Sequence, residues 1–508
     1  MSTPPLTNLA CSSSGAAVLF ATDEWFATAE NLLSPGECPY LDRARSPLVL
    51  SCTPALTSSS SVHRHARTRS DPPVFVPDLY CEQGKVMDGW ETRRKRSAGH
   101  DWCVIRLGGV GAGPCEVRRI ELDTAHFTGN QAPRVSVEGV RVVPPPGRDG
   151  AGRGDDHMYD WMPGAATRLA RGAGGRGVRG TGRRPAEVEA AEAACRDVAR
   201  RIAPGGDGRW MELLPATPLG PGYEDTRRHS FDLTGAALDG ITRMGGVTHV
   251  RLNYFPDGGV ARLRVIGRPL ADAAPVGGNG GGSSAPALPS GACAVVHPHS
   301  SRSDPPSSRP HVHPELSSSA AGGAGVGCSN RHYGVPSNLL APGPGRDMGD
   351  GWETARHPDR PAVVVKDERG LQDTDLMDWA VLRLGSGGTD GGGPSRVILD
   401  TRHFRGNFPE SAAVDGCCAD GLGDDEVIAS AGGKGGTGTV EWFPLVERTP
   451  LSADAEHVFD AGGMPRGGRR RTTHVRVSIY PDGGLSRVRV YGAPAGGGGG
   501  AGFPLSHL

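Results

Sequence analysis

The sequence predicts an all-β protein built from two tandem β-sandwich repeats of the jelly-roll type, with flexible Gly-, Pro- and Ser-rich insertions. Three observations lead to this prediction. Five sequence blocks occur twice in the same order, many short segments alternate apolar and polar residues, and the 508 residues include 78 glycines and 43 prolines. Blocks repeated in a fixed order indicate a duplicated domain, alternation with a period of two indicates half-buried strands, and aperiodic Gly/Pro tracts indicate unpacked chain.

The repeated blocks set the domain boundaries. With their second copies they are 88–92 and 350–354, 101–108 and 378–385, 123–130 and 400–407, 217–219 and 449–451, and 249–259 and 474–484. We therefore expect the following organisation: a first repeat over 1–270 with insertions at about 38–73 and 143–184, a flexible linker over 271–325, a second repeat over 326–492, and a C-terminal tail over 493–508. We expect the insertions to be mobile loops, apart from a helix over 185–202, where apolar residues fall at helical spacing after a proline.

Strands are expected wherever the alternation is clear. Segments 103–107 and 117–122 are predicted strands, as are their second copies at 380–384 and 397–399. Alternating runs also flank Pro256–Gly259 and its second copy, and an Asp-Gly pair between two such runs predicts a β-hairpin. Asp257 and Asp482 in these turns, and His249 and His474 at the strand starts, are first explained as structural residues.

Composition argues against a nucleic-acid-binding protein and against a membrane protein. The formal charge of −1 gives no support for binding nucleic acid or an anionic membrane, and no segment is apolar for long enough to span a bilayer. The 11 cysteines show no regular spacing, which favours reduced thiols in a reducing compartment. The sequence ends in Ser506-His507-Leu508, similar to a peroxisomal Ser-Lys-Leu address, so we expect a peroxisomal or a cytoplasmic location.

Titratable residues retained in both copies are the candidates for chemistry. The Asp123–Asn130 block and its copy Asp400–Asn407 each place an Asp, a His and an Asn within eight residues, a costly group to bury without a purpose. Glu91 and Arg94, with Glu353 and Arg356, add a carboxylate and a guanidinium in each copy. No spacing typical of a zinc site, a phosphate loop or a serine-nucleophile elbow occurs.

At these residues the sequence resembles a known family. The segments 18–33, 85–96, 100–102, 123–130 and 255–265 are similar to allantoicase, and the resemblance extends over most of 16–37, 74–142, 185–268 and 326–492 in family order. It implies two jelly-roll β-sandwich repeats, hydrolysis of allantoate to ureidoglycolate and urea in purine breakdown, and a homo-oligomer. The expected partners are therefore the substrate allantoate and further copies of the chain, and neither nucleic acid nor a membrane is expected.

The chemistry of allantoate suggests roles for the retained residues. Loss of urea requires protonation of a poor leaving group and attack of water on the resulting imine-like carbon, which a general acid and a general base would assist. We expect His126 or His403 to transfer protons, with Asp123 or Asp400 orienting the imidazole. Arg94 or Arg356 would bind the substrate carboxylate, and Glu91, Glu353, Asn130 and Asn407 would complete the binding site. No cofactor is expected, although the residue types leave a divalent metal possible. The alternative is a non-catalytic jelly-roll protein that binds a ligand such as a carbohydrate.

Overall fold

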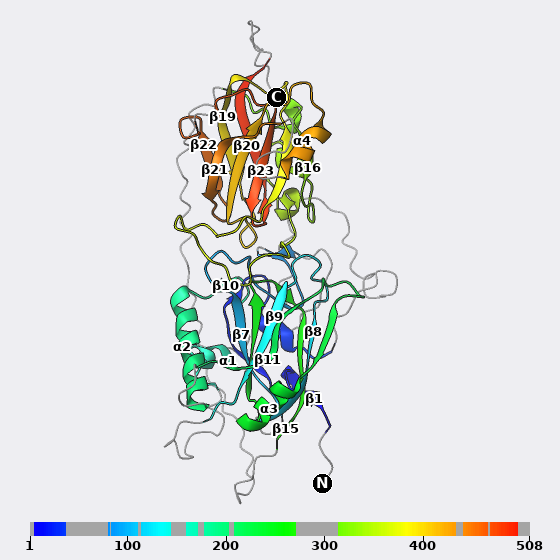
Figure 1. The fold of residues 1–508 in the computed structure, drawn as a ribbon, viewed down its shortest axis with the longest axis vertical. Coiled ribbons are helices and arrows are strands. Elements are labelled where there is room, and N and C mark those ends of the chain that lie inside the picture. Colours follow the sequence, from blue (N-terminus) through cyan, green and yellow to red (C-terminus); the bar gives the residue numbers. More distant parts are fainter. Residues whose placement is uncertain are drawn as a thin grey trace, which may run out of the picture.

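A computed structural model describes residues 5–36, 80–81, 83–109, 113–143, 159–170, 177–202, 208–270, 313–432, 440–465 and 468–495. The predicted insertion at 38–73, most of the linker, the tail beyond 495 and the C-terminal tripeptide lie outside these residues. Figure 1 shows two β-rich halves stacked along the long axis, one for each repeat. The all-β prediction of two sandwich repeats is confirmed.

Each repeat is a sandwich of two antiparallel sheets. In the first repeat a five-stranded sheet has the order β11-β9-β13-β7-β2 and a four-stranded sheet the order β1-β15-β8-β12. In the second repeat the corresponding sheets are β16-β18-β23-β20-β21 and β22-β19-β25. Matching strand orders in the two halves are what duplication of one domain produces.

The first repeat has more strands and helices than the second among the described residues. Its strands are β1 (Thr7–Asn8), β2 (Ala17–Ala21), β3 (Asp23–Glu24), β4 (Tyr80–Cys81), β5 (Gly84–Lys85), β6 (Trp90–Glu91), β7 (Asp101–Arg106), β8 (Cys115–Asp123), β9 (Arg134–Val140), β10 (Thr181–Gly182), β11 (Met211–Pro218), β12 (Arg228–Asp232), β13 (His249–Phe255), β14 (Gly259–Val260) and β15 (Arg262–Pro269). Its helices are α1 (Ala165–Leu169), α2 (Pro185–Ile202) and α3 (Gly235–Met244), with short 3-10 helices at Ser12–Ser14 and Ala29–Leu33.

The second repeat is shorter. Its strands are β16 (Ala324–Cys328), β17 (Trp352–Glu353), β18 (Asp378–Arg383), β19 (Thr389–Asp400), β20 (Ser411–Cys417), β21 (Phe443–Pro450), β22 (Glu456–Asp460), β23 (His474–Tyr480), β24 (Gly484–Leu485) and β25 (Arg487–Pro494). It has one α-helix among the described residues, α4 (Asp424–Ala431), and 3-10 helices at Ser319–Ala321, Pro336–Leu340 and Met348–Asp350. Leu316 already belongs to the buried core of this repeat, so its packed structure starts ahead of residue 326.

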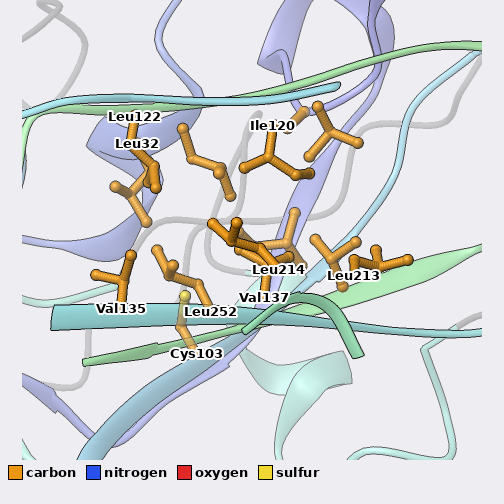
Figure 2. Packing of buried hydrophobic residues seen from close by; sticks show 14 of the residues in the cluster. Leu32, Cys103, Ile120, Leu122, Val135, Val137, Leu213, Leu214 and Leu252 are labelled. Carbon is orange, nitrogen blue, oxygen red and sulfur yellow. The ribbon is translucent and has the colours of Figure 1, made fainter. Parts of the chain in front are cut away.

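The core of each repeat lies between its two sheets. In the first repeat Val137 and Leu252 of the five-stranded sheet face Ile120 and Leu122 of the other sheet, as Figure 2 shows. All four side chains are at most 2% exposed. Strand alternation accounts for the pair Ile120 and Leu122, which flank the polar Glu121, and for the pair Cys115 and Val117. Between the two pairs, at Arg118 and Arg119, the pairing register of β8 with β15 shifts.

The predicted β-hairpins are wrong. β13 and β15 flank the Pro256–Gly258 turn, but β13 pairs with β7 and β9 whereas β15 pairs with β1 and β8 in the opposite sheet. The turn therefore carries the chain from one layer of the sandwich to the other, and β23 and β25 behave in the same way. Alternation is equally compatible with two strands that pair and with two strands that face each other across a core.

The prediction that the insertions are mobile loops is wrong for the described part of 143–184. Met162 and Ala165 are buried against the outer face of the five-stranded sheet, together with Cys195 and Val198 of α2. α2 has the predicted bounds, 185–202, and it lies along one side of the first repeat in Figure 1. α4 covers the equivalent face of the second repeat, where Val427 packs on Val381.

None of the helices among the described residues combines the length and the apolar character needed to cross a membrane.

Candidate active site between the repeats

Glu91 and Glu353 owe their positions to two very short strands. In β6 and β17 a Trp directly precedes the Glu, and both Trp90 and Trp352 are fully buried in the cores of their repeats. Because neighbouring residues of a strand point in opposite directions, the Glu that follows each Trp is directed out of the core. The Trp-Glu pair thus directs an equivalent carboxylate out of the core in each repeat.

Each short strand pairs with the end of the layer-crossing turn. Glu91 is opposite Gly259 of β14, and Glu353 is opposite Gly484 of β24. A Cβ atom at Gly259 or Gly484 would lie 2.1 Å from the ring of Phe127 or Phe404, respectively. The second glycine of the Pro-Asp-Gly-Gly motif is therefore required for close approach to an aromatic ring in both repeats.

Two arginines cross between the repeats. Arg94 of the first repeat donates to Asp482, to Oε1 of Glu353 (3.0 Å) and to the carbonyl of Thr354 (2.7 Å) in the second repeat. Arg356 makes the reciprocal contacts: it donates to Asp257, lies 3.6 Å from Oε1 of Glu91 and donates to the carbonyl of Thr92 (2.9 Å). This exchange gives the junction an approximate two-fold symmetry.

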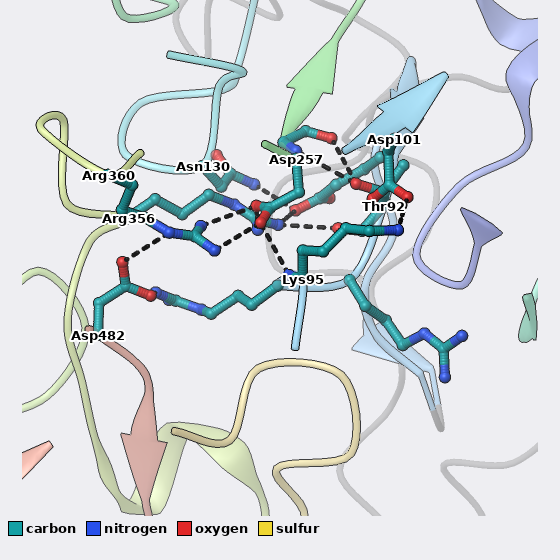
Figure 3. A network of polar contacts seen from close by, with 12 residues as sticks. Thr92, Lys95, Asp101, Asn130, Asp257, Arg356, Arg360 and Asp482 are labelled. Atoms are coloured by element: carbon teal, nitrogen blue, oxygen red, sulfur yellow. Dashed lines mark hydrogen bonds and ion pairs between the residues drawn. The ribbon is translucent and has the colours of Figure 1, made fainter. Parts of the chain in front are cut away.

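A buried ionic layer lies behind the exchanged arginines. Arg360 donates to both carboxylate oxygens of Asp257 (2.9 and 2.6 Å), and its Nε lies 3.7 Å from Asp482 (Figure 3). Arg360 is 2% exposed, and the two aspartates are at most 1% exposed. Burial raises the pKa of Asp257 and of Asp482, but the arginines outweigh it and hold both pKa values below the usual range. The layer is therefore ionised, and it connects the two repeats.

A pocket opens at this junction. Its empty volume, including the part open to solvent, is about 650 Å³. Residues from both repeats line it: Phe26, Lys85, Glu91, Arg94, Asn130, Tyr333, Met348, Gly349, Glu353, Arg356 and Asn407. The pocket is thus a single site shared by the two repeats.

Each repeat contributes one carboxylate–amide pair to the pocket. Nδ2 of Asn130 donates to Oε1 of Glu91 at 2.8 Å, and Nδ2 of Asn407 donates to Oε1 of Glu353 at 2.8 Å. These bonds orient both amides, and both Oδ1 atoms are buried with no donor among the described groups. Each pair thus offers amide and carboxylate acceptors to a ligand that carries N–H groups.

The charge state of Glu91 depends on its burial. Burial raises the pKa of Glu91 above its ordinary value, whereas Arg356 and the Asn130 amide act in the opposite direction. A carboxyl group with a raised pKa can deliver a proton to a leaving group near neutral pH.

The structure brings together all six residues predicted to bind substrate. Glu91, Arg94 and Asn130 of one repeat line the same pocket as Glu353, Arg356 and Asn407 of the other. The contacts of the arginines differ from the expectation, because their Nη groups donate to protein carboxylates and carbonyls. Their visible role is to position the carboxylates.

The four residues predicted to transfer and relay protons are not among those lining the pocket. Oδ1 of Asp123 accepts from the backbone N–H of Ala125 and its Oδ2 from Arg227, while Oδ1 of Asp400 accepts from the N–H of Arg402. His126 and His403 both have φ of 70°, in the left-handed region. The Asp–His part of each block therefore forms a tight turn after a strand, and only the Asn at its end reaches the pocket.

Several pocket residues were missed by the sequence analysis. Phe26 and Tyr333 occupy matching positions ahead of the Asn-Leu-Leu sequence that both copies share, so their retained aromatic character was an available signal. Lys85 and Met348 differ from their counterparts in the other copy, so comparison of the copies gives no signal for them. Asp257 and Asp482 are retained in both copies, but they were assigned to turn geometry. Their retention was the available signal.

Near the pocket, His332 packs edge-on against Tyr333 with ring centroids 4.3 Å apart. Burial lowers the pKa of His332, with Glu353 acting in the opposite direction. This imidazole has no equivalent in the first repeat, where Trp25 occupies the matching position.

A second pocket lies against the insertion of the first repeat, lined in part by Glu24, Arg168 and Arg183. It contains none of the residues retained in both copies. Over the described part of the chain, no three His, Cys, Asp or Glu side chains gather as a metal site would require.

The family model and the curated relatives indicate one family. The family described as Allantoicase repeat matches residues 58–163, 179–270 and 314–495. Probable allantoicase 1 of Burkholderia mallei is 30% identical over 485 residues, 96% of this chain and 94% of the relative, and the probable allantoicase of Rhizobium meliloti is 29% identical over 490 residues, 96% and 94%. A crystal structure of allantoicase from Saccharomyces cerevisiae is 25% identical and covers 96% of this chain and 93% of its own, with a TM-score of 0.26. Since the family match extends over well more than half of the chain, this protein belongs to the allantoicase family.

Proposed function

We propose that this protein hydrolyses allantoate to ureidoglycolate and urea in the pocket between its two repeats. One observation carries the proposal: each repeat directs a Glu–Asn pair into the same pocket. Allantoate carries two identical ureido groups on one carbon, and each pair can accept hydrogen bonds from one of them. Two equivalent binding pairs thus match two equivalent groups of the substrate.

The reaction uses an acid for the departing ureido group and a base for the attacking water. A carboxyl proton passes to the nitrogen of the departing ureido group, the C–N bond breaks, and the nitrogen of the remaining ureido group stabilises the cationic carbon. Water then adds its oxygen to that carbon and gives a proton to the second carboxylate. In this proposal Glu91, whose pKa is raised, is the acid, and Glu353 is the base.

The two exchanged arginines line the pocket and support these roles. Arg94 and Arg356 are bound to the carboxylates behind and beside the pocket, so they hold the glutamates in fixed positions. Fixed charges cost little reorganisation when charge develops on the substrate. The binding-module alternative is not favoured, because the family match extends over both repeats and names an enzyme.

The test substitutes one repeat at a time. Glu91→Gln and Glu353→Gln should each lower kcat by a factor of about 10²–10⁴, the usual contribution of a general acid or base. Two independent sites, one in each repeat, would leave about half of the turnover in either variant. Urea release from allantoate measures the rate, and circular dichroism checks the fold. Turnover near the wild-type value in both variants would refute the shared site.

A further inference from the structure

The two halves of the pocket are alike in their Glu–Asn pairs but differ in charge at the edge. Lys85 of β5 lines the pocket and is half-buried. Counting back from the Asp-Gly-Trp-Glu-Thr block, the matching residue of the second repeat is Asp347. Asp347 does not line the pocket, and its carboxylate caps a short 3-10 helix by accepting from the N–H of Asp350 at 3.2 Å. The positive charge is therefore present in one half only.

The charge of the junction makes this lysine important for an anionic substrate. The pocket and its ionic layer hold four carboxyl groups, of Glu91, Glu353, Asp257 and Asp482, and three guanidinium groups, of Arg94, Arg356 and Arg360. With Glu91 protonated, as its role as the acid requires, the three remaining carboxylates and the three guanidinium groups carry no net charge. Lys85 then adds a positive charge on one side of the pocket, which attracts a carboxylate.

The backbone around Lys85 is held in place. Arg179, from the insertion of the first repeat, donates to the carbonyl of Lys85 at 2.8 Å. β5 pairs with β4, and a Cβ atom at the neighbouring Gly84 would lie 3.2 Å from the ring of Phe26 and 3.4 Å from the methyl group of Met348. The lysine thus extends from a strand that is packed against pocket residues of both repeats.

We propose that Lys85 binds the carboxylate of allantoate and thereby determines which of the two ureido groups is lost. This inference rests on the proposed function. The central carbon of allantoate carries a hydrogen, a carboxylate and two identical ureido groups, so a pocket with two-fold symmetry would accept it in two equivalent orientations. Exchanging the ureido groups between the halves also exchanges the carboxylate with the hydrogen. A cation on one side therefore selects one orientation.

The consequence is a chiral product. In the selected orientation the same ureido group always faces Glu91 and leaves as urea, and water adds from the side of Glu353. The carbon that gains the hydroxyl group in ureidoglycolate then has one configuration. Lys85 is a specificity-determining residue in this scheme, and the proton transfers remain with the glutamates.

The test compares Lys85→Met with Lys85→Arg and with a matched control. Arg346 lies in the equivalent segment of the second repeat, and its side chain is 84% exposed and outside the pocket, so Arg346→Met removes one positive charge without touching the site. KM and kcat are measured with allantoate and with its uncharged amide, 2,2-diureidoacetamide. The enantiomer ratio of ureidoglycolate is measured by chiral chromatography at short reaction times.

Lys85→Met should raise KM for allantoate at least tenfold, leave KM for the amide within about twofold, and shift the product toward a racemic mixture. Lys85→Arg should restore most of the affinity for allantoate and most of the enantiomer excess. Arg346→Met should behave like the wild type. An unchanged KM and enantiomer ratio in Lys85→Met would overturn the inference, as would an equal loss with both substrates. If the glutamine variants lose turnover while Lys85→Met keeps its KM and enantiomer ratio, this inference fails and the shared site stands.

Discussion

Glu91 is held in an environment that disfavours its charged form. The residue is 5% exposed, its Oε1 lies 3.6 Å from Nη2 of Arg356, and Oε1 also accepts from Asn130. Burial is the largest influence on its pKa and raises it, because a carboxylate loses the stabilisation that water gives. The same burial that makes ionisation costly makes Glu91 a suitable proton donor.

The raised pKa of Glu91 predicts an alkaline limit on activity. A general acid must be protonated, so kcat/KM should fall as pH increases through the raised pKa of Glu91. The midpoint of this decrease in kcat/KM should lie at a higher pH than 4.5, the ordinary pKa of a glutamic acid side chain. A profile of kcat/KM against pH, measured as urea release, checks this.

Glu91→Gln serves as the control for the pH profile. The residual activity of this variant should lose the alkaline limb, because glutamine does not titrate. An alkaline limb that persists with the same midpoint in Glu91→Gln would assign it to another group.

The turn that follows β8 and β19 explains why the Asp-Thr-x-His block was retained. His126 and His403 both adopt φ of 70°, a region that costs most residues energy but that His, Asn and Asp enter several times more often. Asp123 and Asp400 accept hydrogen bonds from backbone N–H groups two residues later, which stabilises the turn. The turn delivers Asn130 and Asn407 to the pocket.

Substitution of the two histidines separates a role in the turn from a role in catalysis. We expect His126→Ala combined with His403→Ala to keep kcat within about threefold of the wild type, because neither imidazole lines the pocket. The free energy of unfolding should fall by about 1 kcal/mol per site, and Asn should restore it, since Asn tolerates the left-handed conformation. Rates of urea release and denaturant titration measure the two effects. A loss of kcat of a hundredfold with an intact fold would return the imidazoles to the mechanism.

The segment from β13 to β15 connects the sandwich to the site. It crosses between the two sheets, and its turn supplies both Asp257 to the ionic layer and Gly259 opposite Glu91. The second repeat repeats this arrangement with Asp482 and Gly484. One motif therefore builds the core, connects the repeats and positions the catalytic candidate.

The two repeats are connected through buried ion pairs. Removing one partner of a buried ion pair leaves the other without compensation and costs about 3–5 kcal/mol. Asp257 pairs with Arg356 and Arg360 from the other repeat, so its loss would leave two guanidinium groups with weaker partners.

We therefore expect Asp257→Asn to lower the free energy of unfolding by about 3–5 kcal/mol. The arginines depress the pKa of Asp257 in the folded state, so its contribution is complete above the ordinary value of 3.8 and is lost as pH falls through the folded pKa. Wild-type stability should decline with acid in that range, and the variant should decline less. Urea titration at several pH values measures both.

Asp232→Asn is the matched control, because the side chain of Asp232 is 76% exposed and makes only a surface ion pair with Arg119. No measurable change in stability is expected for it. A similar loss in both variants, or none in Asp257→Asn, would show that the ionic layer does not hold the repeats together.

The sequence alone determined the duplication, the strand-rich sandwich, the helix over 185–202 and the six residues that meet in the pocket. Repetition and alternation are properties of short segments, so they can be recognised without coordinates. The sequence also placed Asp, His and Asn of one block together as a single unit. In the structure they are separated, because the chain makes a left-handed turn at the His. The Asn lines the pocket, whereas the Asp and the His are not among the lining residues.

Contacts between distant parts of the chain decided how the strands pair and how the two repeats meet. Whether two alternating segments pair as a hairpin or face each other across a core depends on the sheet that each one joins, and alternation is the same in both cases. Arg94 donates to the carboxylate of Glu353 at a separation of 259 positions, Arg356 donates to the carbonyl of Thr92 at a separation of 264, and Arg360 donates to Asp257 at a separation of 103. Such contacts depend on how the two repeats dock, which the local pattern of either repeat does not encode. Lys85 begins the segment 85–96 that resembles the family, but its counterpart in the second copy is Asp347, so comparison of the copies did not select it.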